Sequence, residues 1–382
     1  EDMGLIYIGP VDGHNIEEMV TAFQTATSIH DQPVLVHVLT KKGKGYKPAE
    51  KNPDVFHGVG AFDIRSGEPV QDGVDTYTGI FGQWMIEQAA REETLVSVCA
   101  AMPDGTGLRE FSEQYPDRFF DVGIAEEHAV TFAAGLASGG LRPVVSLYST
   151  FMQRAYDQML HDVCISQLPV IVTLDRSGIV GKDGETHQGI FDISFLSSIP
   201  GITILSPMDG EELRESLNFV LHHMQTPAVI RYPRGAAYQY PGTHTSYVYG
   251  KGEILQEGRE VLILAVGNMV ETAIHATDRL RESGIDPTIV NMRFIKPFDE
   301  ELVGRLIEGH SVVVTMEDNV YSGGFSERIQ AFLQDHGWHG RACIPVCLPD
   351  AFIEHGSPED LYEKYRMDAA SVADRIEGII KE

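Results

Sequence analysis

Cysteine, positive charge and long hydrophobic runs are all scarce in this chain of 382 residues. Its four cysteines (Cys99, Cys164, Cys343 and Cys347) are too few and too scattered for a disulfide framework, so we expect reduced, buried thiols. No run of about 18 apolar residues and no basic leader are present, so we predict neither a membrane span nor a secretion signal. We therefore expect a cytoplasmic protein.

Basic residues are outnumbered: 29 lysines and arginines face 56 aspartates and glutamates, a formal net charge of −27. This excess argues against a mainly electrostatic grip on nucleic acid or on an anionic membrane. A small cationic pocket remains compatible with it. The apolar fraction of 43% is that of a folded globular protein.

Short aliphatic runs alternate with helical patterns, which predicts an α/β fold with mostly parallel sheets. Several runs are apolar without alternation, as expected of strands that helices cover on both faces. The runs expected as strands are 34–39, 94–99, 143–148, 169–175, 202–207, 228–232, 261–267, 287–292, 312–317 and 344–348. The segments expected as helices are 16–27, 80–91, 126–138, 209–223, 270–283, 325–336 and 369–381.

Two stretches rich in proline and glycine, 47–77 and 233–252, divide the chain. We predict the tail of a first α/β domain, a linker and two complete three-layer α/β domains; their ranges are 1–60, 61–76, 77–240 and 245–382. The first piece holds one helical pattern and one good strand, too little for an autonomous domain. Because the chain also begins at Glu1 rather than Met, we expect the rest of that domain to precede it in a longer protein.

Polar residues that follow strands are candidates for a site, because ligands gather at the carboxyl ends of parallel strands. In the segment 121–137, Glu126 begins a helix of small apolar residues. Its carboxylate either is buried beside a docked ligand or only complements the helix N-terminus. After the next strand come Tyr148, Phe151 and Arg154, which are either an aromatic stripe of the core or a cleft wall that receives a flat ring.

A glycine-rich segment at 174–194 carries many ionisable groups between its glycines, which favours a functional role over a merely structural one. Arginine and lysine can meet an anion there, and histidine can move a proton near neutral pH. Arg231 and Arg234, at the end of another strand, suit phosphate or carboxylate. The candidate residues that the segment presents are Arg176, Lys182, Asp183, Glu185, His187 and Asp192.

A lysine run at 40–51 contains glycines and Tyr46. It is either a solvated loop or a backbone segment beside a phosphate-bearing ligand. His57 follows in the same irregular region, where a lone histidine is either simply exposed or part of a site.

Seven motifs together resemble the 1-deoxy-D-xylulose-5-phosphate synthase family of transketolase-like, thiamine-diphosphate enzymes. They are GPVDGH (9–14), TKKGKGYKPAEK (40–51), DVGIAEEHAVTFAAGLA (121–137), YSTFMQRAYDQMLHDV (148–163), DRSGIVGKDGETHQGIFD (175–192), RYPRG (231–235) and EDNVYSGGFSE (317–327). The resemblance runs over almost the whole chain, in the right order. It implies a transketolase pyrimidine-binding domain and a transketolase C-terminal domain, the latter mainly structural and dimer-forming.

The activity that the resemblance implies is the decarboxylative condensation of pyruvate with D-glyceraldehyde 3-phosphate, which yields 1-deoxy-D-xylulose 5-phosphate and CO₂ for isoprenoid synthesis. The cofactors would be thiamine diphosphate and Mg²⁺. Glu126 matches the glutamate that hydrogen-bonds N1′ of the aminopyrimidine. Phe151 matches the stacking wall, Tyr148 lies beside pyrimidine and substrate, and Tyr46 matches a cofactor contact.

The resemblance also assigns residues to the substrates. Arg176 and Arg234 would receive the acceptor's phosphate. Asp183 and His187 would meet its hydroxyl and aldehyde. His57 matches a histidine near the reacting carbon, where it would shuttle a proton. Arg154 matches a site residue that would orient its neighbours.

The family's GDG motif for the diphosphate and Mg²⁺ does not occur in this sequence. Metal ligands are therefore expected in an amino-terminal part outside the chain, and we assign none within it. We expect a homodimer, and we expect these residues alone to bind thiamine diphosphate poorly.

Two other functions remain open at this stage. A β-type subunit of a 2-oxo-acid dehydrogenase lacks the diphosphate motif by nature, although the segment 1–60 and the DGETHQG sequence disfavour it. A folded fragment or binding module without turnover is the other alternative. The missing diphosphate motif is the feature that separates it from a complete enzyme.

Overall fold

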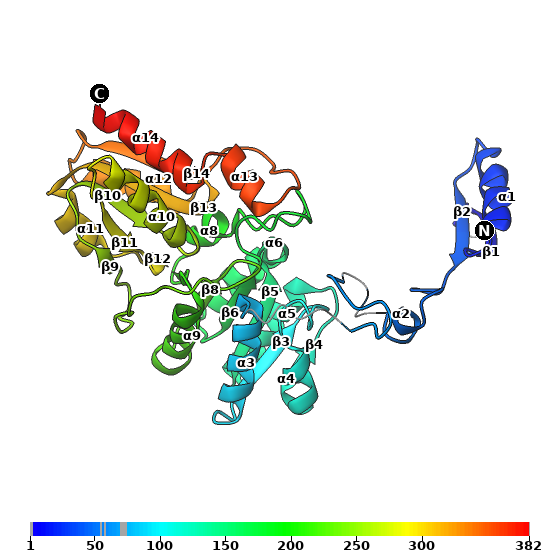
Figure 1. Ribbon diagram of the computed structural model, residues 1–382. Coiled ribbons are helices and arrows are strands. Elements are labelled where there is room, and N and C mark those ends of the chain that lie inside the picture. The colour runs from blue at the N-terminus through cyan, green and yellow to red at the C-terminus, as the bar shows by residue number, and fades with distance from the viewer. Residues whose placement is uncertain (1–2, 54–55, 57–58, 69–74, 382) are drawn as a thin grey trace. The chain divides into compact units, whose positions relative to one another are not determined.

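The computed structural model describes residues 3–53, 56, 59–68 and 75–381 (Figure 1). The chain forms two compact units, residues 1–74 and 75–382. The smaller unit contains a two-stranded sheet, and the larger contains a seven-stranded and a five-stranded sheet.

The smaller unit contains one β-α-β motif. Strands β1 (Ile6–Asp12) and β2 (Val34–Leu39) pair in parallel, joined by α1 (Ile16–Thr27), and α2 (Lys47–Lys51) follows. Several large apolar side chains of this unit are about half exposed: Val20 at 47%, Phe23 at 50% and Leu35 at 49%. One helix on two strands therefore buries little apolar surface, as expected of a segment too short to form its own core.

The larger unit begins with an α/β arrangement around the seven-stranded sheet, whose order is β12-β7-β8-β6-β5-β3-β4. All its neighbouring strands are parallel except the pair β12 and β7. Its elements are α3 (Tyr77–Ala89), β3 (Leu95–Cys99), α4 (Arg109–Gln114), β4 (Phe119–Asp121), α5 (Glu126–Ser138), β5 (Arg142–Tyr148), α6 (Ser149–Met152), α7 (Tyr156–Gln158), β6 (Ile171–Asp175), α8 (Asp192–Ser197), β7 (Thr203–Leu205), α9 (Gly210–His223) and β8 (Ala228–Arg231).

The second sheet of this unit has the order β14-β13-β10-β11-β9, with β9 antiparallel to β11 and the other pairs parallel. Its elements are β9 (Glu253–Gln256), β10 (Glu260–Ala265), α10 (Met269–Glu282), β11 (Thr288–Asn291), α11 (Glu300–Ile307), β13 (His310–Val320), α12 (Phe325–Asp335), β14 (Ala342–Leu348), α13 (Pro358–Lys364) and α14 (Ala369–Lys381). Strand β12 (Phe294–Lys296) leaves this part and pairs with β7 of the other sheet, which ties the two sheets together.

The predicted fold class is confirmed, and each of the ten predicted strands is present. Helices α1, α5 and α14 begin and end at the predicted residues. The prediction missed β1, β4, β9 and β12, together with several short helices. Within the described residues, no helix has the length and apolar character needed to cross a bilayer.

The expectation of buried cysteines is wrong for two of the four. Cys99 and Cys164 are buried, whereas Cys343 and Cys347 are only partly so. Both lie on β14, and a strand at the edge of a sheet has a neighbour on one side only. Burial nevertheless raises the pKa of the Cys347 thiol to about 12.

Strand register brings the ends of the central strands together. Tyr148, the last residue of β5, lies opposite Asp175, the last residue of β6. Cys99 at the end of β3 lies opposite Ser146 of β5 and Asp121 of β4. The carboxyl ends of these strands thus form one edge, the place where open α/β sheets bind ligands.

Candidate active site

Glu126 is buried at the start of α5. Its side chain is 4% exposed, whereas the next residue, Glu127, faces solvent. Arg154 donates a hydrogen bond of 2.8 Å from Nη1 to Oε1 of Glu126, and its own side chain is 51% exposed. Among the described residues no donor meets Oε2. The exposed Glu127 is placed as expected of a residue that only complements the helix N-terminus. The buried Glu126 is placed as expected of a carboxylate beside a ligand.

Two aromatic rings form a flat wall next to this carboxylate. Tyr148 and Phe151 stack with centroids 5.4 Å apart and planes inclined by 12°. Phe151 also contacts the ring of His187, edge to face at 5.6 Å, and the Arg154 guanidinium lies 5.4 Å from its centroid. Tyr148 is buried and Phe151 only partly so. The aromatic pair therefore belongs to the core at Tyr148 and is accessible at Phe151.

The backbone between β5 and β6 departs from a regular helix. After α6 the chain makes a 3₁₀ turn at Gln153–Ala155, resumes as α7, and widens to a π-helix at Met159–Cys164. Arg154 lies in the 3₁₀ turn. Irregular helix segments of this kind are frequent at functional sites, because they re-aim side chains that a regular helix would send elsewhere.

Arg176 is held over the ring of Tyr148. Its guanidinium lies 3.9 Å from the ring centroid, and Nη1 donates to the Gly105 carbonyl at 2.7 Å and to Asp175 at 2.8 Å. Thr78 donates to the other Asp175 oxygen at 2.6 Å. Asp175 is fully buried, and this desolvation raises its pKa to about 6 despite both donors.

Arg234 pairs with Asp183 at 2.9 Å, and both side chains are exposed, 47% and 41%. An exposed pair of this kind contributes little and can open when a ligand arrives. Burial also raises the pKa of the Tyr148 phenol to about 12. The charged groups near enough to act on that phenol are Arg176, Asp175, Arg234 and Asp183.

Most of the sequence-predicted residues thus lie at one edge of the seven-stranded sheet. Glu126, Arg154, Phe151, Tyr148 and Arg176 form a continuous chain of contacts, with His187 against Phe151. The charge of Arg234 lowers the pKa of the Tyr148 phenol, and the charge of Asp183 raises it.

Tyr46 belongs to the other unit. Its ring packs against Phe56 and Phe62, and its hydroxyl donates to the Ile64 carbonyl at 3.0 Å. In the lysine run, Lys41 pairs with Glu50 at 2.5 Å. The candidate His57 lies outside the described residues.

Arg231, which the sequence predicted as a possible binding residue for phosphate or carboxylate, is instead a buried structural residue. It is 2% exposed and donates to Asp192 at 3.0 Å and to the Asp318 carbonyl at 3.1 Å. Its guanidinium is thereby engaged within the protein. Sequence reasoning also missed Asp175 and Asp318, two fully buried carboxylates. Asp175 ends the predicted apolar strand 169–175, and Asp318 directly follows the predicted apolar strand 312–317. These positions were the signal that could have identified them.

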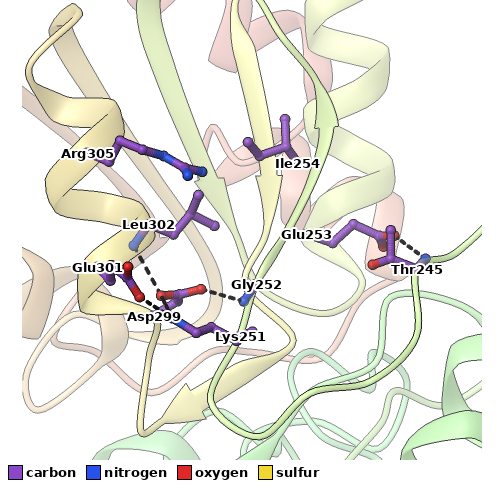
Figure 2. Close-up of a pocket in the computed structure, with 9 residues that line it drawn as sticks. All are labelled: Thr245, Lys251, Gly252, Glu253, Ile254, Asp299, Glu301, Leu302 and Arg305. Carbon is purple, nitrogen blue, oxygen red and sulfur yellow. Dashed lines mark hydrogen bonds and ion pairs between the residues drawn. The ribbon is translucent and has the colours of Figure 1, made fainter.

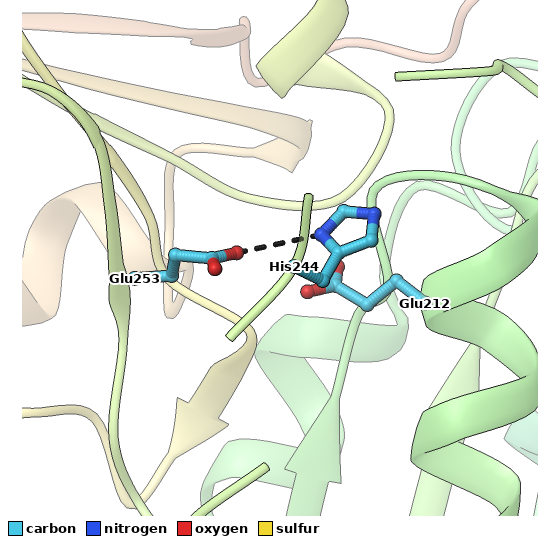
Figure 3. A group of neighbouring side chains, drawn as sticks. All are labelled: Glu212, His244 and Glu253. Carbon is cyan, nitrogen blue, oxygen red and sulfur yellow. Dashed lines mark hydrogen bonds and ion pairs between the residues drawn. The ribbon is translucent and has the colours of Figure 1, made fainter. Parts of the chain in front are cut away.

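A second cluster of ionisable groups contains Glu212, His244 and Glu253, whose nearest ligand atoms lie within 4.8 Å of one another (Figure 3). Arg293 donates to Glu212 at 2.6 Å and to Glu253 at 2.7 Å. His244 bonds Asp209 at 2.9 Å. Because a guanidinium already occupies both carboxylates, these residues do not fit a metal ion and form a buried ion-pair network instead.

A hollow of about 410 Å³ lies between the segment before β9 and the start of α11 (Figure 2). Figure 2 shows Lys251 directed at Asp299 and Glu301, which it contacts at 3.2 and 2.6 Å. None of the sequence-predicted site residues lines it. The hollow is a feature separate from the edge that carries the aromatic pair.

Three family models match the chain. They are the transketolase pyrimidine binding domain over residues 75–239, the transketolase C-terminal domain over 250–372, and 1-deoxy-D-xylulose-5-phosphate synthase over 1–40. Together they match most of the chain. The site residues of the larger unit named above lie in the first of these ranges, except His244, Glu253, Arg293, Asp318 and the residues of the hollow.

Among curated proteins, a 1-deoxy-D-xylulose-5-phosphate synthase of Lachnoclostridium phytofermentans is 50% identical over 378 residues, 98% of this chain and 60% of that protein. Another, from Caldanaerobacter subterraneus subsp. tengcongensis, is 50% identical over 377 residues, again 60% of its length. The chain thus spans about 60% of the length of the curated relatives it matches.

Two solved structures are similar in fold. One, described as a split gene transketolase in an inactive β4 tetramer, has a TM-score of 0.70 at 26% identity, covering 80% of this chain and 98% of that one. The transketolase of Campylobacter jejuni gives a TM-score of 0.67 at 16% identity, covering 99% of this chain and 68% of the other.

Proposed function

Because this chain belongs to the transketolase-like family, on the 1-deoxy-D-xylulose-5-phosphate synthase branch, we propose that it provides the pyrimidine-facing and acceptor-binding side of such a synthase. The reaction is the condensation of pyruvate with D-glyceraldehyde 3-phosphate, with loss of CO₂. The observation that carries the proposal is the buried carboxylate of Glu126 beside the stacked pair Tyr148 and Phe151.

These residues fit the aminopyrimidine of thiamine diphosphate. The fit rests on a buried carboxylate that is held through Oε1 by Arg154 and on a ring wall that is open at Phe151. When bound, thiamine diphosphate supplies the electron sink for decarboxylation. Glu126 would donate a hydrogen bond to the pyrimidine ring nitrogen through its carboxyl group, and Phe151 would fix the ring plane by stacking. Arg154 orients the Glu126 carboxyl group.

The acceptor side would be built from cations and the glycine-rich segment. Arg176 keeps N–H groups beyond those bonded to Asp175 and Gly105, and Arg234 can exchange Asp183 for a phosphate, because that exposed ion pair is weak. Both guanidinium groups act on the Tyr148 phenol, so a phosphate held by both would lie beside the aromatic wall. His187, against Phe151, would exchange a proton with the acceptor's carbonyl oxygen.

Diphosphate and Mg²⁺ binding we assign to an amino-terminal part, since the GDG motif is absent from these residues. For Tyr46 we propose a cofactor contact, and for His57 a proton shuttle, as the family resemblance implies. We further propose a cytoplasmic homodimer that is inactive without that amino-terminal part. The match to a split transketolase described as inactive supports this last point.

The test compares this chain alone with the assembled enzyme, meaning the chain joined to the amino-terminal part of a synthase such as that of Lachnoclostridium phytofermentans. Calorimetry with thiamine diphosphate and Mg²⁺, followed by an assay of CO₂ and sugar phosphate, gives the readout. We expect weak binding and no product from the chain alone, and both from the assembled enzyme. Robust product from these residues alone would overturn our placement of the diphosphate site.

A further inference from the structure

We propose that Asp318, on β13, is a positioning residue that fixes the glycine-rich loop, residues 176–191, so that Asp183 and His187 stand at the aromatic wall. The family resemblance implies only a structural and dimer-forming role for the part of the chain that carries Asp318. The proposal gives that part a task at the site. Its kinetic consequence rests on the proposed function, whereas the contact itself does not.

The contact joins Asp318 to the base of the loop. Asp318 is fully buried, and its Oδ2 accepts the Ile179 backbone N–H at 3.0 Å and the Tyr362 hydroxyl at 2.6 Å. Asn268 donates to the same oxygen at 3.3 Å. A carboxylate this deeply buried needs such donors, and one of them is the loop backbone.

The loop approaches Asp318 so closely that only glycine fits. At Gly178 φ is +76°, and a Cβ there would lie 1.9 Å from Oδ2 of Asp318. Gly178 and Gly189 exchange two backbone hydrogen bonds, of 2.7 and 2.8 Å, which close the base of the loop. The glycines are thus explained by the approach to Asp318 and by this closure, in addition to any ligand.

Apolar packing places the same loop against the five-stranded sheet. Ile179 and Ile190 are buried in one cluster with residues of β10, β13 and β14. The Val320 backbone N–H, two residues beyond Asp318, donates to the Ile190 carbonyl at 3.0 Å. Figure 1 shows α8, which follows the loop, beside β13. Both ends of the loop are therefore anchored, and its tip, with the exposed Asp183 and the half-buried His187, is carried by them.

The matched control is the adjacent buried carboxylate. Glu317, also on β13 and fully buried, accepts the backbone N–H groups of Phe325 and Ser326 at 2.7 Å each. It therefore caps the start of α12, and both of these hydrogen bonds go to that helix and to no amide of the loop. Replacing either carboxylate removes a buried acceptor of backbone amides, but only Asp318 serves the glycine-rich loop.

Hydrogen–deuterium exchange on the chain tests the contact directly. In Asp318→Ala we expect the Ile179 amide and the loop amides to exchange faster by about tenfold or more, with β10 unchanged. Asp318→Asn, which keeps an acceptor for Ile179, should restore slow exchange. Glu317→Ala should speed exchange at Phe325 and Ser326 instead. Unchanged loop exchange in Asp318→Ala overturns the proposal.

The assembled enzyme tests the consequence. In Asp318→Ala, KM for glyceraldehyde 3-phosphate should rise about tenfold or more while KM for pyruvate stays unchanged, because Asp183 and His187 face the acceptor. Equal effects in Glu317→Ala would reduce Asp318 to a general stability role. If Asp318→Ala does not fold, Gly178→Ala disturbs the contact from the loop side and must give the same exchange pattern. A wild-type assembled enzyme without activity would refute the proposed function, and the exchange data would still decide the contact.

Discussion

Arg154 donates a 2.8 Å hydrogen bond to the buried carboxylate of Glu126, and it comes from a 3₁₀ turn in an irregular stretch of helix. A buried carboxylate is costly unless it is paired, and Arg154 is the hydrogen-bond donor that the described residues offer. The pair joins α5 to the segment after β5, and so fixes where the carboxylate points.

Arg154→Gln should therefore destabilise the larger unit by about 1 kcal/mol, because it leaves a buried carboxylate with a weaker donor while water reaches part of the gap. Chemical denaturation measures this loss. Arg214→Gln is the control. It breaks an ion pair between Arg214 and Glu87, whose side chains are 36% and 35% exposed, and it should change stability by less than about 0.5 kcal/mol. Equal losses in the two variants would show that the burial of Glu126 has no energetic consequence.

Gly105 lies against the site at a position where a side chain does not fit. A Cβ at Gly105 would stand 1.9 Å from the Tyr148 hydroxyl oxygen, and the Gly105 carbonyl accepts from Arg176. Gly105→Ala should cost about 1–3 kcal/mol and alter the near-ultraviolet dichroism of the tyrosine. Gly135→Ala is the control: its Cβ meets nothing within 4 Å in the middle of α5, so it should stabilise by up to about 1 kcal/mol. A harmless Gly105→Ala would contradict the tight packing around Tyr148.

Asp175 should make the free energy of unfolding depend on pH. Burial raises its pKa from 3.8 to about 6, so the fold favours the neutral carboxyl. Its contribution is present in full below about pH 4 and is lost as pH rises through about 6, amounting to about 3 kcal/mol. Asp175→Asn keeps a group that can bond both Thr78 and Arg176, and it should lack this component. Denaturation of both proteins from pH 4 to 8 gives the difference, and parallel curves would refute the assignment.

His244 should make the free energy of unfolding depend on pH in the same direction, but in a higher pH range. The hydrogen bond to Asp209, followed by that to Glu253, raises its pKa from 6.5 to about 10, so the imidazolium of Figure 3 is charged at neutral pH. Its contribution is present in full below about pH 6.5 and is lost as pH rises through about 10. His244→Gln should cost about 1–3 kcal/mol at pH 7 and less at pH 10. His161→Gln, at an exposed pair with Asp157, should cost little at either pH. A loss for His244→Gln that stays constant with pH would contradict a charged His244.

The sequence predicted the parts whose residues interact locally. Helices α1 and α5 follow from periodic patterns, and the central strands follow from uninterrupted apolar runs. Strand β12 escaped prediction because it has three residues and exists only by pairing with β7, some 90 residues earlier. The edge strand β4 is equally short.

In the candidate site, too, residues marked by local patterns were predicted, and residues that depend on distant contacts were not. Motifs located Glu126, Tyr148, Phe151 and the glycine-rich loop, because each follows a strand or begins a helix. Sequence patterns did not separate Arg231, a buried partner of Asp192, from the exposed Arg234 three residues later, because burial there depends on β13 and α8. Asp318 was likewise hidden: its partner Ile179 is 139 residues away.

Deuterium exchange of the C2 proton of bound thiamine diphosphate, followed by NMR in the assembled enzyme, tests the central claim that Glu126 serves the aminopyrimidine. The claim predicts that Glu126→Gln slows this exchange at least about a hundredfold, while Glu127→Gln, at the exposed neighbour, leaves it unchanged. Exchange at the wild-type rate in Glu126→Gln, with the cofactor bound and the fold intact, would contradict it.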